Sequence, residues 1–335
     1  MRYLSPIFYI IGILILIIVL FLPQTRGRWI ELGGFQFQPS ELMKVIYIIF
    51  LAKIFSELHH RDVYLPQLII PILFTVLPVL LIFIEPDIGT AIIFIIIFLG
   101  MIGTLRIPLP RYFLYISPLL SLLCGFNLIS WIIFMLLLIA ALLFANIKFR
   151  DGLLLFLLNV LLGSLAPKLP LLLKPYQKDR LMSFLNPSWD PTGAGWHILQ
   201  SKISIGSGGF FGKGYLNGII KNLGFLPQTR TDFIFAVLGE EFGFLGTLIL
   251  ILLFVYFLAK ILILAQSAKD PFKKYLAYGI LFYFSSQIIV NIGMTVGLLP
   301  VVGLPLPFIS YGGTSMLVST VFIGLIFSIR KRLYA

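Results

Sequence analysis

Uninterrupted apolar runs of roughly twenty residues recur from one end of this chain to the other. Wound as an α-helix, such a run spans the ~30 Å hydrocarbon core of a bilayer, where only helices and closed barrels satisfy their own backbone hydrogen bonds. The 335 residues are 59% hydrophobic and 11% charged, whereas soluble domains are about a quarter charged. The sequence therefore excludes a soluble globular protein and predicts an all-α, polytopic transmembrane helical bundle.

The apolar runs define about ten candidate spans within a single integral membrane domain, residues 1–335. The first run is too long for a signal peptide and no small-residue cleavage site follows it, so we interpret it as a retained span. The predicted spans are Leu4–Leu22, Ser40–Glu57, Pro66–Ile84, Ile88–Leu105, Tyr112–Asn127, Leu128–Ile147, Gly152–Leu165, Phe233–Leu264, Leu276–Leu298 and Tyr311–Ile329. Residues 167–231 form the one sizeable stretch between spans.

Positive charge in the short loops predicts the orientation, because cytoplasmic loops retain Lys and Arg. The net charge of +12 comes from such short clusters, which indicate orientation and contact with anionic lipid; no nucleic-acid partner is expected. On one side the short loops hold only Arg26 and Arg28. We therefore predict that both termini are cytoplasmic and that 167–231 is a large extracytoplasmic loop. The predicted cytoplasmic set is Arg2, Arg61, Arg106, Arg111, Lys148, Arg150, Lys269, Lys273, Lys274, Arg330, Lys331 and Arg332.

Four ionisable residues, Glu41, Lys44, Asp87 and Asp232, fall near the predicted outer ends of their helices. A charge inside a span costs at least a few kcal/mol and is a functional candidate by default. Helices that begin at this level also direct their N-terminal dipole ends toward it, and such ends bind phosphates. The pattern predicts a site for a diphosphate, with carboxylates available as a general base or as ligands of a divalent cation.

Each of these residues also has a purely structural explanation. Glu41, Asp87 and Asp232 stand where a helix begins, and acidic residues are common there as caps. Glu41 and Lys44 are spaced i, i+3, which suits a local ion pair. The sequence leaves both explanations open.

Glu240 and Glu241 lie about 12 Å along the same predicted helix from Asp232, near the middle of the membrane. That depth suits a transport path. The alternative is burial against polar groups of neighbouring helices, such as Asn291 or Gln287.

The predicted outer loop contains a glycine cluster that is not a phosphate-binding loop, because Lys213 is followed by Gly214 where Ser or Thr is required. Before it, Trp196, Leu199 and Ile203 recur every three to four residues, which predicts an amphipathic helix on the membrane surface. None of the histidines has metal-ligand spacing, so no metal is assigned to them.

Taken together, four segments strongly resemble the SEDS family, named for shape, elongation, division and sporulation. They are Gln38–Lys44 (QPSELMK), Glu85–Thr90 (EPDIGT), Thr231–Glu241 (TDFIFAVLGEE) and Pro307–Gly313 (PFISYGG). Gly193–Gly214 and Pro300–Pro307 resemble the RodA-like elongation branch more than the division branch.

The resemblance covers roughly Pro23–Leu105 and Tyr176 to the C-terminus. Relatives usually carry two spans before the one that opens this chain, and about one span where this chain has three between Tyr112 and Leu165.

The resemblance implies a peptidoglycan glycosyltransferase of the bacterial cytoplasmic membrane that polymerises lipid II at the outer face during cell elongation. Its implied partners are the nascent glycan, a class B penicillin-binding transpeptidase and other membrane proteins of the elongation complex. The essential acid of the family corresponds to Asp232 and its cavity residues to Glu41, Lys44 and Asp87. Two nearby cations, Arg230 and Lys202, are further substrate-binding candidates.

In this interpretation Asp232 is the general base that deprotonates the GlcNAc 4-hydroxyl, and attack on the α-linked donor gives a β-1,4 linkage by inversion. Lys44, helix ends and a divalent cation, Mg²⁺ or Mn²⁺, would stabilise the departing undecaprenyl diphosphate, with Glu41 orienting Lys44. The alternatives are a lipid II flippase, which Glu240 and Glu241 favour, and a membrane scaffold of the cell-wall synthesis complex in which the acids are only caps.

Overall fold

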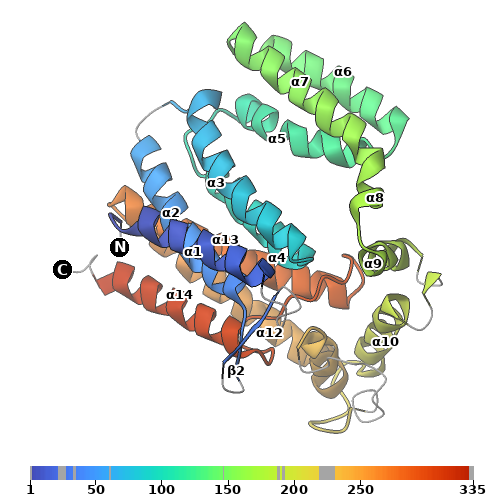
Figure 1. The fold of residues 1–335 in the computed structure, drawn as a ribbon. Coiled ribbons are helices and arrows are strands. Elements are labelled where there is room, and N and C mark those ends of the chain that lie inside the picture. Colours follow the sequence, from blue (N-terminus) through green and yellow to red (C-terminus); the bar gives the residue numbers. More distant parts are fainter. Residues whose placement is uncertain are drawn as a thin grey trace. The chain divides into compact units, whose positions relative to one another are not determined.

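The computed structural model describes residues 2–21, 28–32, 35–59, 62–145, 147–186, 189–190, 193–218 and 231–331. These residues are almost entirely helical (Figure 1). The elements are α1 (Ser5–Phe21), β1 (Ile30–Leu32), β2 (Phe35–Phe37), α2 (Pro39–Leu58), α3 (Leu65–Ile84), α4 (Ile88–Gly103), α5 (Leu109–Cys124), α6 (Leu128–Phe144), α7 (Phe149–Leu165), η2 (Ala166–Lys168), α8 (Leu169–Leu172), α9 (Pro175–Leu185), α10 (Ala194–Ser207), α12 (Ile234–Ser267), α13 (Pro271–Thr295) and α14 (Gly313–Lys331).

The helices have the length and surface of a multi-pass membrane protein. Five described helical segments are long and apolar enough to cross a membrane, and α1, α4, α5 and α6 are shorter apolar helices. Large apolar side chains lie exposed along these helices, where lipid rather than water is the solvent that suits them. The predicted all-α membrane fold is thus confirmed, and each predicted span overlaps a described helix. The number of crossings and the extent of the outer loop stay predictions.

The Cα positions cluster into two compact units, 1–57 with 73–101 and 179–335, and 58–72 with 102–178. In the first unit α2, α4 and α13 approach closely through small residues. A Cβ on Gly279 would lie 2.5 Å from Ile48 Cγ2, and one on Gly100 would lie 2.4 Å from the ring of Phe282. Glycine at these contacts lets helix backbones come together, as is usual between membrane helices.

The second unit contains α5, α6 and α7, with α6 and α7 running side by side in Figure 1. Its core includes Leu114, Leu138 and Leu155. Buried polar groups pair across these helices: Asn159 Nδ2 donates to Ser117 Oγ at 2.8 Å, and Ser121 Oγ donates to the Asn159 carbonyl at 2.7 Å. Such bonds satisfy polar atoms that lipid could not.

A two-stranded antiparallel hairpin, absent from the sequence prediction, leads into α2. β1 and β2 pair with Ile30 opposite Phe37. Thr314 of α14 donates through Oγ1 to the Gln36 carbonyl at 3.0 Å and accepts from the Gln38 amide at 3.4 Å. The hairpin therefore fixes the chain entering α2 against α14.

Helix α12 is broken at Gly243, whose φ of 65° and ψ of −163° are not helical. The single continuous span predicted over Phe233–Leu264 is wrong in this respect. The carbonyls of Glu240 and Glu241 accept from the amides of Lys213 and Gly214, each at 3.0 Å. Beyond the break the amides of Phe244 and Leu245 donate to the carbonyls of Gly209 and Phe210, at 2.9 and 3.1 Å. The loop 208–214 thus satisfies the backbone groups that the break exposes.

Close approach explains the glycine cluster of this loop. A Cβ on Gly208 would lie 2.0 Å from the Gly239 carbonyl oxygen, and one on Gly212, which has a φ of +83°, would lie 2.3 Å from the Glu241 carbonyl oxygen. Only glycine brings the loop backbone this near to the backbone of α12.

Candidate active site

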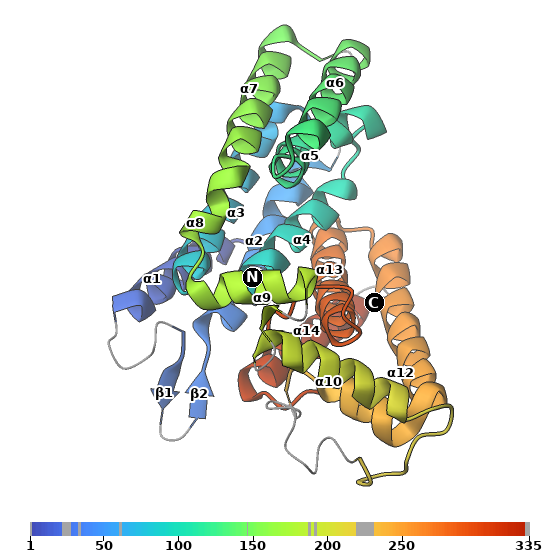
Figure 2. The ribbon, with the colours of Figure 1, turned by 90° about the vertical axis from the view of Figure 1, so that its right-hand side faces the viewer.

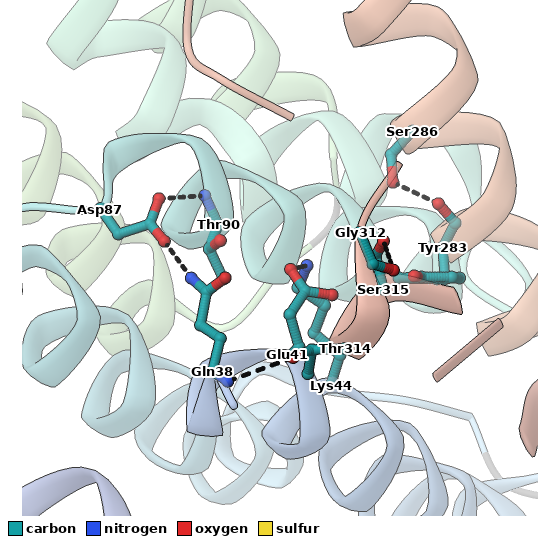
Figure 3. A network of polar contacts seen from close by, with 10 residues as sticks. All are labelled: Gln38, Glu41, Lys44, Asp87, Thr90, Tyr283, Ser286, Gly312, Thr314 and Ser315. Carbon is teal, nitrogen blue, oxygen red and sulfur yellow. Dashed lines mark hydrogen bonds and ion pairs between the residues drawn. The ribbon is translucent and has the colours of Figure 1, made fainter. Parts of the chain in front are cut away.

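Asp87 is the N-cap of α4. Its Oδ1 accepts from the Thr90 amide at 3.1 Å, and its backbone carbonyl accepts from the Ala91 amide. Its Oδ2 accepts from Gln38 Nε2 at 2.8 Å (Figure 3). The capping explanation is therefore correct for Asp87, and the second oxygen joins α4 to the residue that precedes α2.

Glu41 and Lys44 form an ion pair inside the protein. Lys44 Nζ donates to Glu41 Oε1 at 2.5 Å, and Lys44 is 0% and Glu41 3% exposed (Figure 3). With its amide oriented to satisfy both neighbours, Gln287 of α13 accepts from Lys44 Nζ at 3.2 Å and donates to the Pro305 carbonyl at 3.3 Å. The i, i+3 pair predicted from the sequence is thus confirmed as a buried contact that also ties α2 to α13.

The backbone at Asp232 is held by α13 and by the loop that precedes α14. Asn291 Nδ2 donates to the Asp232 carbonyl at 3.0 Å and to the Leu304 carbonyl at 2.6 Å. Ser310 Oγ donates to the Thr231 carbonyl at 2.5 Å and accepts from the Leu306 amide at 2.7 Å. Two segments far from Asp232 in sequence therefore fix its backbone.

Asp232 does not cap α12, because the N-cap position belongs to Phe233. Its half-buried carboxylate lies beside an open point in the 300–306 loop: a Cβ on Gly303 would be 3.3 Å from Asp232 Oδ2 and 4.0 Å from Arg180 Nη1. Gly303, with a φ of +75°, adopts a conformation that favours glycine. A carboxylate, a guanidinium and a position without a side chain therefore meet at one place.

The electrostatic surroundings make Asp232 a stronger base than a free aspartate. Burial raises its pKa, the Arg180 guanidinium and a Thr231 hydrogen bond lower it, and the nearby charge of Asp87 raises it again, with the net value above normal. A helix N-terminus alone would have weakened the base. Desolvation outweighs that effect here.

The site residues differ in how far substrate can reach them. Asp87, Arg180 and Asp232 are each half-buried, whereas Glu41 and Lys44 are fully enclosed. Gln287 and Asn291, one turn apart on α13, both donate to the 304–305 backbone and so connect the two groups. One shared water-accessible cavity for the four predicted residues stays a prediction.

Glu85, in the turn between α3 and α4, is a buried acid that the sequence did not single out by itself. Neither of its carboxyl oxygens has a hydrogen-bond partner in the part of the chain that the structure describes. Burial and the neighbouring Asp87 raise the pKa of Glu85 to about 8, with the Arg28 guanidinium opposing them. Arg28 donates to the carbonyls of Glu85 (2.8 Å) and Pro86 and so holds this turn.

The other predicted site residues fall elsewhere. Lys202, on α10, lies against Gly297: a Cβ there would be 2.6 Å from Lys202 Nζ. This contact is with the turn after α13, and the role of Lys202 in substrate binding stays a prediction. Arg230 lies outside the described residues.

Glu240 is fully buried and bonded, but its described partners are not Asn291 or Gln287. Lys213 Nζ donates to Glu240 Oε1 at 2.7 Å and to Ser207 Oγ at 2.8 Å, and Ser204 Oγ donates to Glu240 Oε2 at 3.3 Å. The glutamate thus ties α12 to the glycine loop beside the break at Gly243. The prediction that Glu240 is buried against polar groups is therefore confirmed, but with other partners than those predicted.

Among the described residues no three His, Cys, Asp or Glu side chains are grouped as metal ligands. Both oxygens of Asp87 already accept hydrogen bonds, and Asp232 faces Arg180. The described side chains therefore do not form a metal site by themselves. A bound divalent cation would need most of its ligands from another molecule.

Sequence reasoning missed Arg180, and it named Asn291 and Ser310 without linking either to Asp232. All three lie far from Asp232 along the chain, and no spacing rule connects them to it. Gln38 was quoted as part of a motif, but its bond to Asp87 depends on the packing of α2 beside α4.

Comparison with known proteins places these features in context. A family model for the cell cycle proteins FtsW, RodA and SpoVE matches residues 1–116 and 103–335. The peptidoglycan glycosyltransferase MrdB of Escherichia coli is 36% identical over 97% of this chain and 77% of that protein. The peptidoglycan glycosyltransferase RodA of Treponema pallidum is also 36% identical, over 91% of this chain and 77% of that protein.

Solved structures give the same picture. A chain from a study of the structural coordination of polymerization and crosslinking by a peptidoglycan synthase complex superposes with a TM-score of 0.70 at 25% identity, covering 99% of this chain and 82% of that one. The rod shape determining protein RodA of Thermus thermophilus superposes with a TM-score of 0.59 at 22% identity, covering 100% and 80%, and that likeness bears on the fold alone.

Proposed function

Because this chain belongs to the FtsW/RodA/SpoVE family, we propose that it is a peptidoglycan glycosyltransferase that polymerises lipid II into β-1,4-linked glycan strands. The observation that carries the proposal is the position of Asp232. Asn291 fixes its backbone and Ser310 fixes the neighbouring Thr231. Its carboxylate caps no helix and lies with Arg180 beside Gly303.

In the proposed reaction the Asp232 carboxylate takes the proton of the acceptor GlcNAc 4-hydroxyl. The hydroxyl oxygen then bonds to C1 of the donor MurNAc, the bond from C1 to the diphosphate oxygen breaks, and undecaprenyl diphosphate leaves with the electron pair. A raised pKa suits a general base that works near neutral pH. Attack from the face opposite the diphosphate inverts the α-linkage.

We assign Arg180 as the cation that binds the departing diphosphate, since it is half-buried and lies beside Asp232. A guanidinium recognises phosphate oxygens through two parallel donors. Lys44 is enclosed in its pair with Glu41, so direct contact with the diphosphate would require α2 or the 300–306 loop to move. Within this proposal Lys44 supports the site with its charge and holds Gln287 in place.

A divalent cation, Mg²⁺ or Mn²⁺, stays a prediction in which diphosphate oxygens supply most of the ligands. None of the steps above passes through it.

The proposed setting is the bacterial cytoplasmic membrane, with both termini inside and the site facing outward. Loop charge supports this orientation. The partner we propose is a class B penicillin-binding transpeptidase, in line with the similarity to a chain of a peptidoglycan synthase complex. Further membrane proteins of the elongation machinery are proposed on the family resemblance alone.

One of the two acids that favoured the flippase alternative has a structural role. Glu240 is paired with Lys213 and Ser204 beside a break in α12, which does not leave it free to line a transport path. The scaffold alternative required the acids to be caps, and Asp232 is not one.

Asp232→Asn tests the proposal, with Asp270→Asn as the matched control. Asp270 caps α13 through a bond from the Phe272 amide at 3.0 Å, and asparagine caps about as well as aspartate. Purified Asp232→Asn protein should polymerise lipid II at least about 100-fold more slowly, the usual scale for loss of a positioned base. Asp270→Asn should retain the wild-type rate. Comparable polymerisation by a folded Asp232→Asn protein would reject the assignment.

A further inference from the structure

A cavity of about 240 Å³ lies within the second compact unit, well apart in sequence from the residues of the proposed active site. It lies where α5, α7 and the segment before α3 meet. Its polar lining consists of Tyr64, Arg111, Tyr115, Lys148 and Asp151, and its apolar lining includes the buried Leu155. Neither the proposed reaction nor the family motifs use any of these residues.

Two cations of the cavity have no carboxylate partner in the described chain. The Arg111 guanidinium carbon lies 5.2 Å from the centre of the Tyr64 ring, which orients the side chain without neutralising it. Neither Arg111 nor Lys148 forms an ion pair with the described residues. The arginine and the lysine of this cavity are therefore available to bind an anion.

The one acid in the lining does not cancel them. Asp151 is in the first turn of α7, where the helix dipole favours a negative charge, and its Oδ1 lies 4.0 Å from Arg150 Nε. The lining therefore holds two cations and one carboxylate, and that carboxylate also lies beside the exposed Arg150 outside the cavity. The phenol groups of Tyr64 and Tyr115 add hydrogen-bond donors suited to phosphate oxygens.

The flanks of the cavity are apolar and exposed. Leu109, at the start of α5, is 79% exposed, and Phe149, at the start of α7, is 85% exposed. Side chains of this kind beside a basic pocket at a helix end suit acyl chains next to a headgroup. The loop-charge pattern puts these helix ends on the cytoplasmic side, where anionic lipids concentrate.

We propose that this cavity is a binding site for the phosphate of an anionic phospholipid of the inner leaflet, with Arg111 and Lys148 as its cationic ligands. Arg111 contributes the planar, doubly donating contact, and Lys148, at the rim, contributes a point charge. The flanking Leu109 and Phe149 contact the first acyl carbons.

Lipid retention on the purified protein tests the proposal. Full-length protein in neutral detergent is stripped of lipid, titrated with phosphatidylglycerol or with phosphatidylcholine, and followed by native mass spectrometry. Arg111→Gln and Lys148→Gln should each weaken phosphatidylglycerol binding about fivefold, the change that corresponds to ~1 kcal/mol per basic residue near anionic lipid. Phosphatidylcholine binding should stay the same in all proteins.

Arg106→Gln is the control, because Arg106 is an exposed cation in the same unit that does not line the cavity. Equal losses in Arg106→Gln and the two pocket variants would overturn the site in favour of diffuse surface charge. Inorganic phosphate that displaces the lipid at equal concentration would overturn the lipid as its occupant. Lys148 is exposed, so Lys148→Gln should fold normally. Its phosphatidylglycerol affinity therefore tests the site even if Arg111→Gln does not fold.

Discussion

Asp87 and Asp232 are both aspartates at the start of a helix, but their surroundings give them different roles. Asp87 uses one oxygen on the Thr90 amide and the other on Gln38, so it is fully bonded. Asp232 leaves the cap position to Phe233 and faces Arg180. Asp232 is the carboxylate that caps no helix and lies beside a cation, so it is the one we propose to accept a proton.

Glu85 should make stability depend on pH. The pKa of Glu85 is raised from 4.5 to about 8 in the folded protein, so between these values the folded state holds a proton that the unfolded state has lost. Its contribution to stability is therefore fully present below about pH 4.5 and is lost as the pH rises through 8. Thermal unfolding in detergent from pH 5 to pH 9 should show a falling Tm in the wild type.

The variant Glu85→Gln should remove that slope, because glutamine stays neutral. Its Tm should equal or exceed the wild-type value at pH 9, with little difference at pH 5. Parallel slopes in the two proteins would mean that Glu85 is ionised in the fold at neutral pH.

The pair of Glu41 and Lys44 predicts a non-additive double-mutant cycle. Lys44→Met leaves the buried Glu41 carboxylate without its cation and should cost about 3–5 kcal/mol, whereas the double variant with Glu41→Gln should recover much of that loss. Unfolding of the two single variants and the double variant measures the coupling. Additive losses would show that the two charges do not interact.

At the scale of elements, the break in α12 determines where the helix that follows Asp232 leads. Residues 234–242 run beside α10 before the chain turns into residues 244–267, as Figure 2 shows. The glycine loop 208–214 closes the break by backbone bonds on both sides, and Lys213 adds the pair with Glu240. The break is therefore an ordered kink whose exposed backbone groups are hydrogen-bonded by the glycine loop.

Gly243→Ala should destabilise this kink. A Cβ at Gly243 would lie 2.3 Å from the Gly212 nitrogen, which is backbone and cannot rotate away, and the φ of 65° is unfavourable for alanine. We expect a loss of about 1–3 kcal/mol, the range for a strained backbone position. Thermal unfolding measures it.

Gly206→Ala is the matched control, since Gly206 lies in the nearby helix α10 and a Cβ there meets no described atom within 4 Å. Alanine is the better helix former, so this variant should be as stable as the wild type or slightly more so. Equal effects of the two substitutions would remove the argument for an ordered kink at Gly243.

For the whole molecule, the orientation in the membrane is the property with the widest consequences, because it decides which face substrate reaches. The charge bias predicts that Asn217, in the glycine-loop region, is outside and that Lys269, between α12 and α13, is inside. With Cys124 replaced by serine, a cysteine at Asn217 should react with a membrane-impermeant thiol reagent added to intact cells. A cysteine at Lys269 should react only after the membrane is opened, and the reverse pattern would invert the topology.

The sequence by itself determined the helical membrane fold and the helices that carry the four candidate residues. Apolar run length is a local property, since each span must satisfy its backbone within itself, and the i, i+3 spacing of Glu41 and Lys44 is local too. The sequence prediction missed the hairpin before α2 and the break at Gly243, both of which depend on contacts with distant parts of the chain. The sequence does contain Gly33-Gly34 between two short alternating runs, a hairpin signal that went unused.

Only the tertiary structure decided which acid is free to react. Arg180 and Asn291 contact Asp232, and Ser310 bonds the neighbouring Thr231, each from a separate segment. The pair of Glu240 and Lys213 likewise joins residues 27 positions apart. Such contacts depend on how helices pack, and packing is set by side-chain shape summed over many distant residues rather than by any spacing along the chain. The raised pKa values of Asp232 and Glu85 arise the same way, because burial is a property of the assembled fold.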